Sequence, residues 1–324
     1  MTEKDLKLVY MGTPEFAVAP LKALISNDYS VKAIVTVPDK PAGRGQHLQS
    51  SPVKIYAQTT GLPLLQPFSM KEPQFIEQLK SLAPDVILVV AFRLLPPEVW
   101  KIASIGTINL HASLLPNYRG AAPIQHAIMN GETITGLTTF FIDEGIDQGK
   151  IILQQAVPIH PNETAGSLHD RMMQLGAELI LKTLHIITTS DFQPKDQNNL
   201  MEENIVLHYA KKITRQDCKI DWHNPVQKIF NQIRALNPSP GAFTILQSPN
   251  GNNFILKVFY ANPLSDHHHS KAPGSLITDG KSFVKVACTD GFLELTEVQL
   301  SGKKRMDIVS FLRGFSLDAL WTMR

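Results

Sequence analysis

The sequence predicts an α/β fold with a mostly parallel sheet, followed by a smaller β-barrel domain. In the first half, apolar strand-like runs alternate with helix-like segments, which is typical of a parallel sheet covered on both faces. In the last third, short apolar runs are bounded by Gly, Pro, Asn and Asp, which is typical of a small barrel or sandwich. The length of 324 residues also favours two domains over one.

The elements of the first half follow from apolar spacing. Strands are expected at 6–12, 31–37, 85–92, 106–111 and 136–143. Helices are expected at 14–27, 51–61, 72–84 and 165–187. The strand DVILVVAF has the longest apolar run and should be the most deeply buried. Ser51 is a candidate N-cap for its helix, and Gly61 is a candidate stop.

The composition and the apolar periodicity of the sequence change after the first half. The stretch 191–204 is polar and aperiodic and predicts a linker. A helix is expected near 224–236, followed by strands at 242–247, 253–260, 274–278, 282–288 and 292–300. We therefore predict an α/β domain over 1–190, a linker over 191–207 and a β-barrel domain over 208–324.

Charge is unevenly distributed along the chain. The net charge is +2, but residues 208–324 carry 15 Lys and Arg against 9 Asp and Glu. This basic C-terminal part hints at a polyanionic partner, although ordinary variation in surface charge explains the number equally well. Two cysteines, Cys218 and Cys288, show no CxxC or metal-ligand spacing, so a reducing compartment fits. Without a signal sequence or spanning segment, we expect a cytoplasmic monomer that binds no membrane.

Asn109 and His111 end the apolar run GTINLH. Positions two apart on a strand share a face, so these side chains either are satisfied polar residues at a strand end or form half of a catalytic site. The turn FIDEGIDQGKI adds Asp143, Glu144 and Asp147. Asn can donate to an oxyanion, and a carboxylate can stabilise and orient an imidazolium. Asn109, His111 and Asp147 together suit acyl transfer without an enzyme nucleophile, at strand ends where α/β proteins bind ligands.

Other patterns indicate less. No GxGxxG follows a strand and no GxxxxGK[ST] occurs, so a nicotinamide-dependent oxidoreductase is disfavoured. The long loop 38–52 carries Lys40, Arg44 and His47; it is either a solvated surface loop or a basic finger that binds phosphates. The run His267–His269 has no further ligand at suitable spacing and is expected to be a solvated loop.

These motifs carry a family resemblance. NLHASLLPNYRGAAPIQ, followed by Asp147 in DEGIDQGKI, resembles the folate-dependent formyltransferases. MGTPEFA, PDKPAGRG and SPVK resemble those members that act on methionyl-tRNA, and IRALNPSPGAF and LTEVQLSGKKRM resemble their second domain. The resemblance covers nearly the whole chain and implies a Rossmann-like formyltransferase fold followed by an OB-like barrel. Glycinamide ribonucleotide formyltransferases share the Asn-His-Asp core but lack this loop and the second domain.

The resemblance implies a reaction and a set of roles. The formyl group of 10-formyltetrahydrofolate passes to the α-amine of methionine on initiator tRNA, giving formylmethionyl-tRNA for translation initiation, and no metal is expected. The catalytic residues are Asn109, His111 and Asp147. The folate-binding residues are Ser113, Leu114, Leu115 and Pro116. The RNA-binding residues are Arg44, Lys40, Lys211, Lys212, Lys303, Lys304 and Arg305.

Two alternatives and two departures accompany this interpretation. The chain could formylate a small amine, such as a ribonucleotide or sugar nucleotide, or it could be a non-catalytic RNA-binding module. Phe92 and Arg93 stand where the family commonly has Tyr and Gly, which bears on the folate pocket wall. Ser239 stands where Trp is usual, which bears on packing or RNA contact in the second domain.

Overall fold

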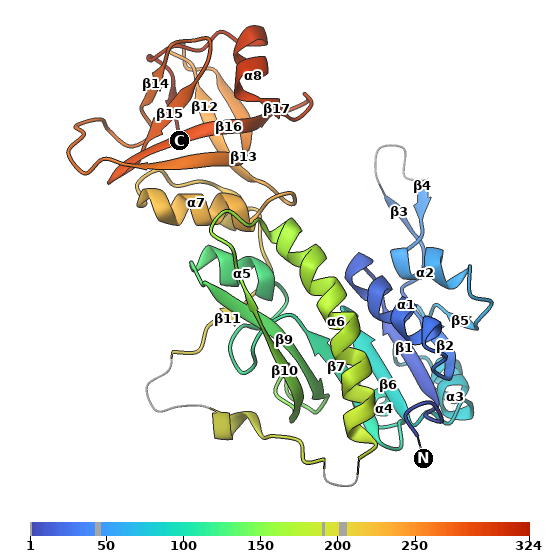
Figure 1. Ribbon diagram of the computed structural model, residues 1–324. Coiled ribbons are helices and arrows are strands. Elements are labelled where there is room, and N and C mark those ends of the chain that lie inside the picture. The colour runs from blue at the N-terminus through green and yellow to red at the C-terminus, as the bar shows by residue number, and fades with distance from the viewer. Residues whose placement is uncertain (1, 43–46, 190–191, 201–205) are drawn as a thin grey trace. The chain divides into compact units, whose positions relative to one another are not determined.

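The computed structural model describes residues 2–42, 47–189, 192–200 and 206–324. The chain divides into two compact units, each built around one seven-stranded sheet (Figure 1). Unit 1 comprises Met1–Gly120, Ile134–Pro158 and His169–Tyr209, and unit 2 comprises Ala121–Thr133, Ile159–Leu168 and Ala210–Arg324. No helix in these described segments is long and apolar enough to cross a membrane.

The sheet of unit 1 confirms the predicted mostly parallel α/β fold. Its strand order is β10-β9-β7-β6-β1-β2-β5. The parallel strands are β1 (Leu8–Gly12), β2 (Val31–Val35), β5 (Leu64–Leu65), β6 (Val86–Val90) and β7 (Gly106–His111). Two antiparallel strands, β9 (Ile134–Phe141) and β10 (Ile151–Pro158), complete the sheet. Strand β10 was not predicted, because as an edge strand it has a mixed pattern of buried and exposed residues.

Helices cover both faces of this sheet, as buried parallel strands require. They are η1 (Glu15–Ala17), α1 (Val18–Ser26), α2 (Pro52–Ala57), α3 (Pro73–Ser81), α4 (Pro97–Trp100) and α6 (Ala165–Ile187), the last of which begins in unit 2. Phe75 of α3 and Val99 of α4 belong to one apolar cluster with Val89 of β6. On α6, a Cβ at Gly176 would meet the Leu110 side chain of β7 at 2.8 Å, so glycine permits close packing there.

The ends of α2 show one prediction confirmed and one wrong. Ser51 is the N-cap, and its side chain accepts the backbone N–H three residues along at 3.0 Å. Gly61 does not mark the stop, because the helix ends at Ala57. The Thr60 hydroxyl binds the Ala57 carbonyl at 2.7 Å and so competes for an acceptor that a further helical turn would need.

The segment 38–52, predicted as a long loop, contains a paired stem. Strands β3 (Lys40–Ala42) and β4 (His47–Gln49) form an antiparallel hairpin in which Lys40 pairs with Gln49. Arg44 lies outside the described residues. The remaining short elements are β8 (Arg119–Gly120), η2 (Gln197–Leu200) and β11 (Tyr209–Ala210). Strand β8 pairs with β11.

Unit 2 confirms the predicted β-barrel. Its antiparallel strands run in the order β14-β15-β16-β13-β12-β18, and β17 pairs with β16. They are β12 (Ala242–Gln247), β13 (Asn253–Ser265), β14 (Leu276–Thr278), β15 (Val284–Ala287), β16 (Gly291–Leu300), β17 (Met306–Asp307) and β18 (Thr322–Met323). A bridge between Ser275 and Thr322 joins the two ends of this order, so the sheet closes almost completely. The helices are α5 (Pro123–Met129), η3 (Gln216–Cys218), α7 (Val226–Ala235) and α8 (Ile308–Gly314).

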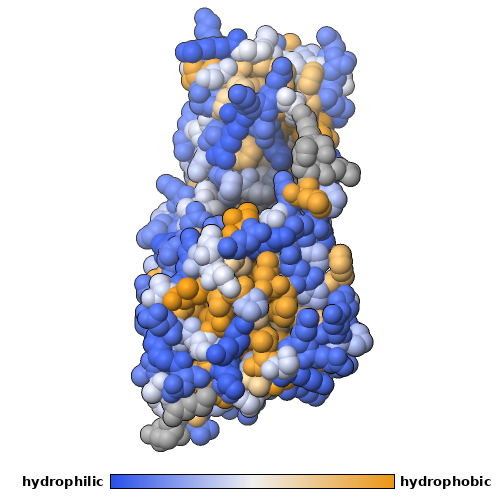
Figure 2. Space-filling model, turned by 90° about the vertical axis from the view of Figure 1, so that its right-hand side faces the viewer, coloured by the Kyte–Doolittle hydropathy of each residue, from blue (hydrophilic) through white to orange (hydrophobic). Residues whose placement is uncertain are grey.

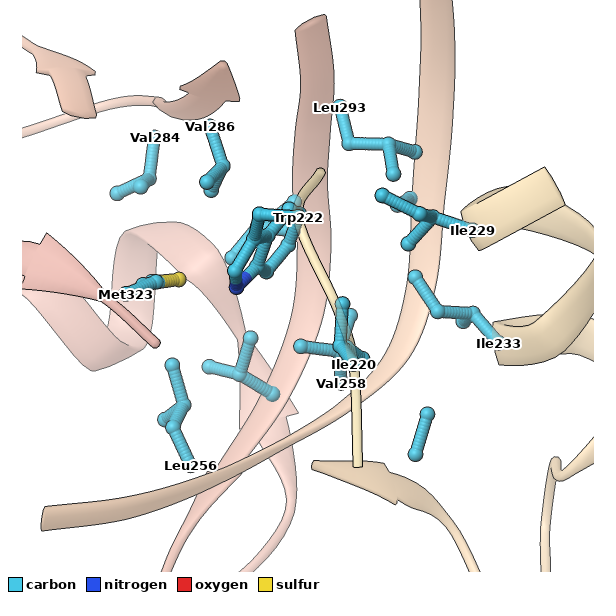
Figure 3. Close-up of a cluster of buried hydrophobic side chains, with 14 of the residues drawn as sticks. Ile220, Trp222, Ile229, Ile233, Leu256, Val258, Val284, Val286, Leu293 and Met323 are labelled. Carbon is cyan, nitrogen blue, oxygen red and sulfur yellow. The ribbon is translucent and has the colours of Figure 1, made fainter. Parts of the chain in front are cut away.

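The core of unit 2 is centred on Trp222. Its side chain is 2% exposed, and its Nε1–H donates to the Thr244 hydroxyl at 3.0 Å, which satisfies the one polar atom of the indole. Figure 3 shows the indole among aliphatic side chains of the strands and of α7, including Val286, Leu293 and Ile229.

Candidate active site

Asn109 and His111 lie in the carboxyl-terminal half of β7 and project from the same face of the sheet. Pairing with the neighbouring strands places Val89 and Phe140 on either side of Asn109, and Thr138 beside His111. Asn109 is half-buried, and within the described residues its side-chain amide has no hydrogen-bond partner. Among the described residues, this donor is thus left free for a ligand, with apolar residues opposite it on both adjacent strands.

The imidazole of His111 is fixed from both sides. Its Nε2 lies 2.9 Å from the Tyr118 carbonyl oxygen, and a carbonyl can only accept, so Nε2 carries the proton. Its Nδ1 then faces the Asp147 carboxylate, with 3.7 Å between Nδ1 and Oδ2. Tyr118 adopts a left-handed φ of 60°, and its own N–H donates to the His208 carbonyl at 2.7 Å. The ring is 6% exposed, so solvent competes little for these partners.

Asp147 reaches His111 from the turn between β9 and β10. Its Oδ2 accepts the backbone N–H of Gly120 at 2.8 Å. Asp147 has φ 53°, a conformation that non-glycine residues adopt rarely. Two residues later, a Cβ at Gly149 would lie 1.7 Å from the Phe141 carbonyl oxygen, so only glycine fits there. The turn is therefore shaped to bring the carboxylate back to the strand end.

The other two carboxylates of this turn do not reach the imidazole. The Asp143 carboxylate accepts the N–H of Gly145 within its own turn at 2.9 Å. Glu144 is exposed, and its Oε1 lies 3.9 Å from the Lys101 ammonium. Of the three acidic side chains in FIDEGIDQGKI, Asp147 is thus the one that the structure places beside His111.

The turn Ser113–Pro116 is fastened to β9 and β10 by two side chains. The buried Thr138 hydroxyl donates to the Ser113 carbonyl at 2.6 Å and accepts the Leu115 N–H at 3.2 Å. The Gln154 amide donates to the Leu115 carbonyl at 2.8 Å. These backbone groups already have protein partners. Neither Thr138 nor Gln154 was singled out from the sequence. The pattern that could have indicated them is a polar residue within an apolar run, Thr138 in GLTTFFID and Gln154 in IILQQAVP.

The side chains of that turn divide into two kinds. Ser113 and Leu115 are buried and hold the turn in place. Leu114 and Pro116 are partly exposed, and Leu114 covers Gly136, where a Cβ would meet its Cδ2 at 2.4 Å. A ligand at this turn would therefore contact Leu114 and Pro116 more readily than the backbone.

The segment after β6, where this chain departs from its family pattern, is held by Arg93. Its guanidinium donates to the carbonyls of Pro67 at 2.7 Å and Phe68 at 2.9 Å, which joins the loops that follow β5 and β6. Partial burial lowers the pKa of Arg93. Phe68 and Leu94 beside it are 84% and 79% exposed. Figure 2 shows one face of unit 1, on which apolar side chains gather among polar ones.

The predicted RNA-binding residues differ in their surroundings. Lys40, Lys212, Lys303 and Lys304 are exposed and make no ion pair within the described residues. Lys211 Nζ lies 3.1 Å from Asp217 Oδ1. Hydrogen bonds from Thr214, and then from Lys211, hold the pKa of the Asp217 carboxyl at about 2.

Arg305 is part of the packing of unit 2. Its guanidinium pairs with the Glu297 carboxylate, which raises the pKa of Arg305, and lies 4.2 Å from the centroid of the Phe259 ring. Ser239, where Trp is usual, is exposed between Pro238 and Pro240. Nothing in the structure explains that departure.

The histidines of the 267–269 run form no metal cluster. Across the described segments, no group of three or more His, Cys, Asp or Glu side chains is arranged to hold a metal ion. The His269 ring instead packs against Phe292, with 4.5 Å between centroids.

Comparison with known families covers both units. The family described as formyl transferase matches residues 6–184, and the family described as formyl transferase, C-terminal domain, matches residues 212–316. The methionyl-tRNA formyltransferase of Bacteroides thetaiotaomicron is 45% identical over 318 residues, which are 98% of each chain. The methionyl-tRNA formyltransferase of Parabacteroides distasonis is 46% identical over 324 residues, which are 100% of each chain.

Solved structures share the fold at lower identity. WlaRD, a sugar 3N-formyl transferase crystallised in the presence of dTDP and 5-N-formyl-THF, aligns with a TM-score of 0.62 and 22% identity over 92% of this chain and 99% of its own. HypX from Aquifex aeolicus, in complex with tetrahydrofolic acid, aligns with a TM-score of 0.61 and 18% identity over 95% of this chain, which spans about half of HypX (47%). Given the full-length relatives and both matched domains, the chain belongs to the methionyl-tRNA formyltransferase family.

Proposed function

We propose that the chain transfers the formyl group of 10-formyltetrahydrofolate to the α-amine of methionine esterified to initiator tRNA. The observation that carries this proposal is the meeting of three side chains at the carboxyl end of β7, an interior strand of the unit 1 sheet. Asn109 and His111 share a face of β7, and Asp147 Oδ2 lies 3.7 Å from His111 Nδ1. This trio suits acyl transfer to an amine without a covalent enzyme intermediate.

Asn109 would hold the formyl oxygen. The folate cosubstrate supplies an activated formyl group, and negative charge develops on the formyl oxygen when the amine attacks. The Asn109 amide has no partner among the described residues and lies between Val89 and Phe140. A neutral donor in apolar surroundings stabilises such charge well, because little solvent screens it. The site therefore fits a formyl group at this position.

His111 would add a second donor to the same oxygen. Its Nε2–H is given to the Tyr118 carbonyl in this structure, so the proposal includes exchange of that hydrogen bond for one to the substrate. Asp147 would orient the imidazole for this exchange from the Nδ1 side of the ring. The same carboxylate would take up the proton that the amine loses, directly or through a water molecule. The bond between the formyl carbon and N10 of the folate then breaks, and N10 would take up a proton by the same route.

The partners follow from the two units. Leu114 and Pro116 would contact the folate, while Ser113 and Leu115 keep their turn in place. The exposed Lys212, Lys303 and Lys304 would contact tRNA phosphates, as would Lys40 of β3. Arg44, which lies outside the described residues, is proposed as a further contact on the resemblance of its motif alone. Full-length relatives named methionyl-tRNA formyltransferase support this acceptor over a small amine.

The test is a choice of acceptors. The protein is incubated with 10-formyltetrahydrofolate and either initiator methionyl-tRNA, elongator methionyl-tRNA, glycinamide ribonucleotide or a dTDP-amino sugar. Formylated product is separated by chromatography and counted from a labelled formyl group. We expect rapid formylation of initiator methionyl-tRNA alone. Preferential formylation of either small amine would replace the proposed acceptor, and no formylation of any acceptor would leave the RNA-binding alternative.

A further inference from the structure

The segment Phe192–Leu200, which the sequence predicted as part of a linker, is attached to unit 1 next to the Asp147 turn. The Phe192 ring lies 6.4 Å from the Phe141 ring, centroid to centroid. Lys195 and Ile151 exchange two backbone hydrogen bonds of 2.8 Å. Two residues after Lys195, Gln197 is 1% exposed although it belongs to a polar, aperiodic stretch. Such burial of a polar side chain requires that its hydrogen bonds be made.

Gln197 makes four hydrogen bonds, all within unit 1. Its Oε1 accepts from Arg119 Nε at 3.1 Å and from Arg119 Nη2 at 2.6 Å. Its Nε2 donates to the Asp147 carbonyl at 2.9 Å and to the Gly149 carbonyl at 2.8 Å. Arginine only donates and a carbonyl only accepts, so the two ends of the amide cannot be exchanged. One side chain therefore joins Arg119 of β8 to the carbonyls of Asp147 and Gly149.

This amide closes a ring of contacts around the Asp147 carboxylate. Arg119, which holds Gln197, directly precedes Gly120, whose N–H donates to Asp147 Oδ2 at 2.8 Å. Asp147 is thus held through its carbonyl by Gln197 and through its carboxylate by Gly120. Its left-handed φ of 53° is uncommon for a residue other than glycine, although less so for Asp than for most, and the surrounding hydrogen bonds hold it.

We propose that Gln197 is a positioning residue that acts through Asp147, setting the distance between that carboxylate and the His111 imidazole. This inference rests on the proposed function, in which Asp147 is catalytic. Gln197 lies behind the turn, bonded to its carbonyls rather than to the carboxylate. Its loss should therefore lower the rate of the chemical step and leave substrate binding nearly unchanged.

Two substitutions of Gln197 separate its two sets of bonds. Gln197→Met keeps the length of the side chain and removes all four hydrogen bonds. Gln197→Glu keeps an acceptor for Arg119 and removes the two donors to the carbonyls of Asp147 and Gly149. We expect both variants to lose kcat by about 10- to 100-fold, because a displacement of about 1 Å at a reacting group can cost 10²-fold. KM for folate donor and for methionyl-tRNA should change less than about twofold.

Controls distinguish positioning from stability. Asn199→Ala changes an exposed side chain of the same η2 segment and should keep the parent kcat. If Gln197→Glu keeps the parent kcat while Gln197→Met does not, the role of Gln197 is to hold Arg119 and the proposal is wrong. Far-ultraviolet circular dichroism and the thermal midpoint identify variants that fail to fold, and a folded Gln197→Glu variant alone suffices for the test.

A double-mutant cycle with Asp147→Asn decides whether Gln197 acts through Asp147. We expect Gln197→Met to lower kcat strongly in the parent and by less than about twofold in the Asp147→Asn background. Full, independent losses in both backgrounds would overturn the inference while leaving the catalytic role of Asp147 intact. If Asp147→Asn alone keeps the parent kcat, Asp147 has no catalytic role and Gln197 cannot act through it. If the parent protein formylates no acceptor, the proposed function fails, which is a distinguishable result.

Discussion

His111 Nδ1 and Asp147 Oδ2 lie 3.7 Å apart. This separation is too long for a direct hydrogen bond but short enough for an ion pair or a bridging water. Catalytic hydrogen bonds are often long before substrate binds and shorten in the reactive complex. The Gly120 N–H meanwhile holds the same carboxylate oxygen at 2.8 Å, so the carboxylate is oriented before any substrate arrives. The predictions for the site follow from this arrangement.

Asp147→Asn should reduce kcat by at least two orders of magnitude and leave folate affinity nearly unchanged. The amide keeps the size of the carboxylate but cannot accept the amine's proton. Steady-state formylation assays measure kcat, and fluorescence titration measures folate binding. Parent-like kinetics would remove Asp147 from the proposed mechanism.

Asn109→Ala should lower kcat by about 10²- to 10³-fold, the loss of about 2.7–4 kcal/mol that follows removal of one oxyanion donor. Because the Asn109 side chain makes no hydrogen bond within the described residues, the substitution should leave the free energy of unfolding nearly unchanged. Urea denaturation provides that second measurement. A variant that is strongly destabilised instead would show that Asn109 is a structural polar residue at a strand end.

Thr138→Val should destabilise the protein by about 1–3 kcal/mol, because it leaves the Ser113 carbonyl and the Leu115 N–H buried without their partner. Thr135 offers a matched control on the same strand, since its buried hydroxyl has no hydrogen-bond partner in the described part of the chain. Thr135→Val should be neutral or stabilising. Urea unfolding of both variants tests this, and equal losses would show that the hydroxyl contacts of Thr138 contribute little.

Apolar patterns predicted most of the fold, because a continuous buried strand or an amphipathic helix leaves a clear periodic signal. The strands 106–111 and 242–247 were predicted with the bounds that the structure has. The edge strand β10 was missed because two polar residues, the exposed Gln154 and the half-buried Gln155, interrupt its apolar run. The short strands β17 and β18 were missed because two residues carry no period.

The site was predictable where its residues share a strand and less so where distant segments meet. Alternation along β7 is enough to put Asn109 and His111 on one face. The Gln197 contacts depend instead on where a polar stretch folds back onto the β9–β10 turn, and local composition does not encode that. Burial of Gln197 is visible only in three dimensions, since its neighbours Asn198 and Asn199 are exposed.

Both cysteines should resist thiol reagents in the native protein. Burial raises the pKa of Cys288 to about 12 and also raises the pKa of Cys218. The thiolate is the reactive form, and it becomes appreciable only as pH approaches the raised pKa. At pH 8, Ellman's reagent should therefore react slowly with folded protein and rapidly with both thiols in denaturant. Rapid reaction at Cys288 in the folded protein, located by mass spectrometry, would contradict this.

We expect Lys303 and Lys304 to contact RNA and their neighbour Arg305 to stabilise the fold of unit 2. Lys303 and Lys304 are exposed and unpaired within the described residues, whereas Arg305 bonds Glu297 and lies over the Phe259 ring. Replacing both lysines by alanine should weaken tRNA binding and reduce the slope of log K against log salt by about 0.7–0.9 for each phosphate that is no longer neutralised. The thermal midpoint of this double variant should stay at the parent value.

Arg305→Ala should instead lower the thermal midpoint, because Glu297 loses its partner and the Phe259 ring loses its cation. Filter binding across a salt series, with melting curves for each variant, measures both quantities. An unchanged salt slope for the double lysine variant would place the RNA elsewhere on the protein.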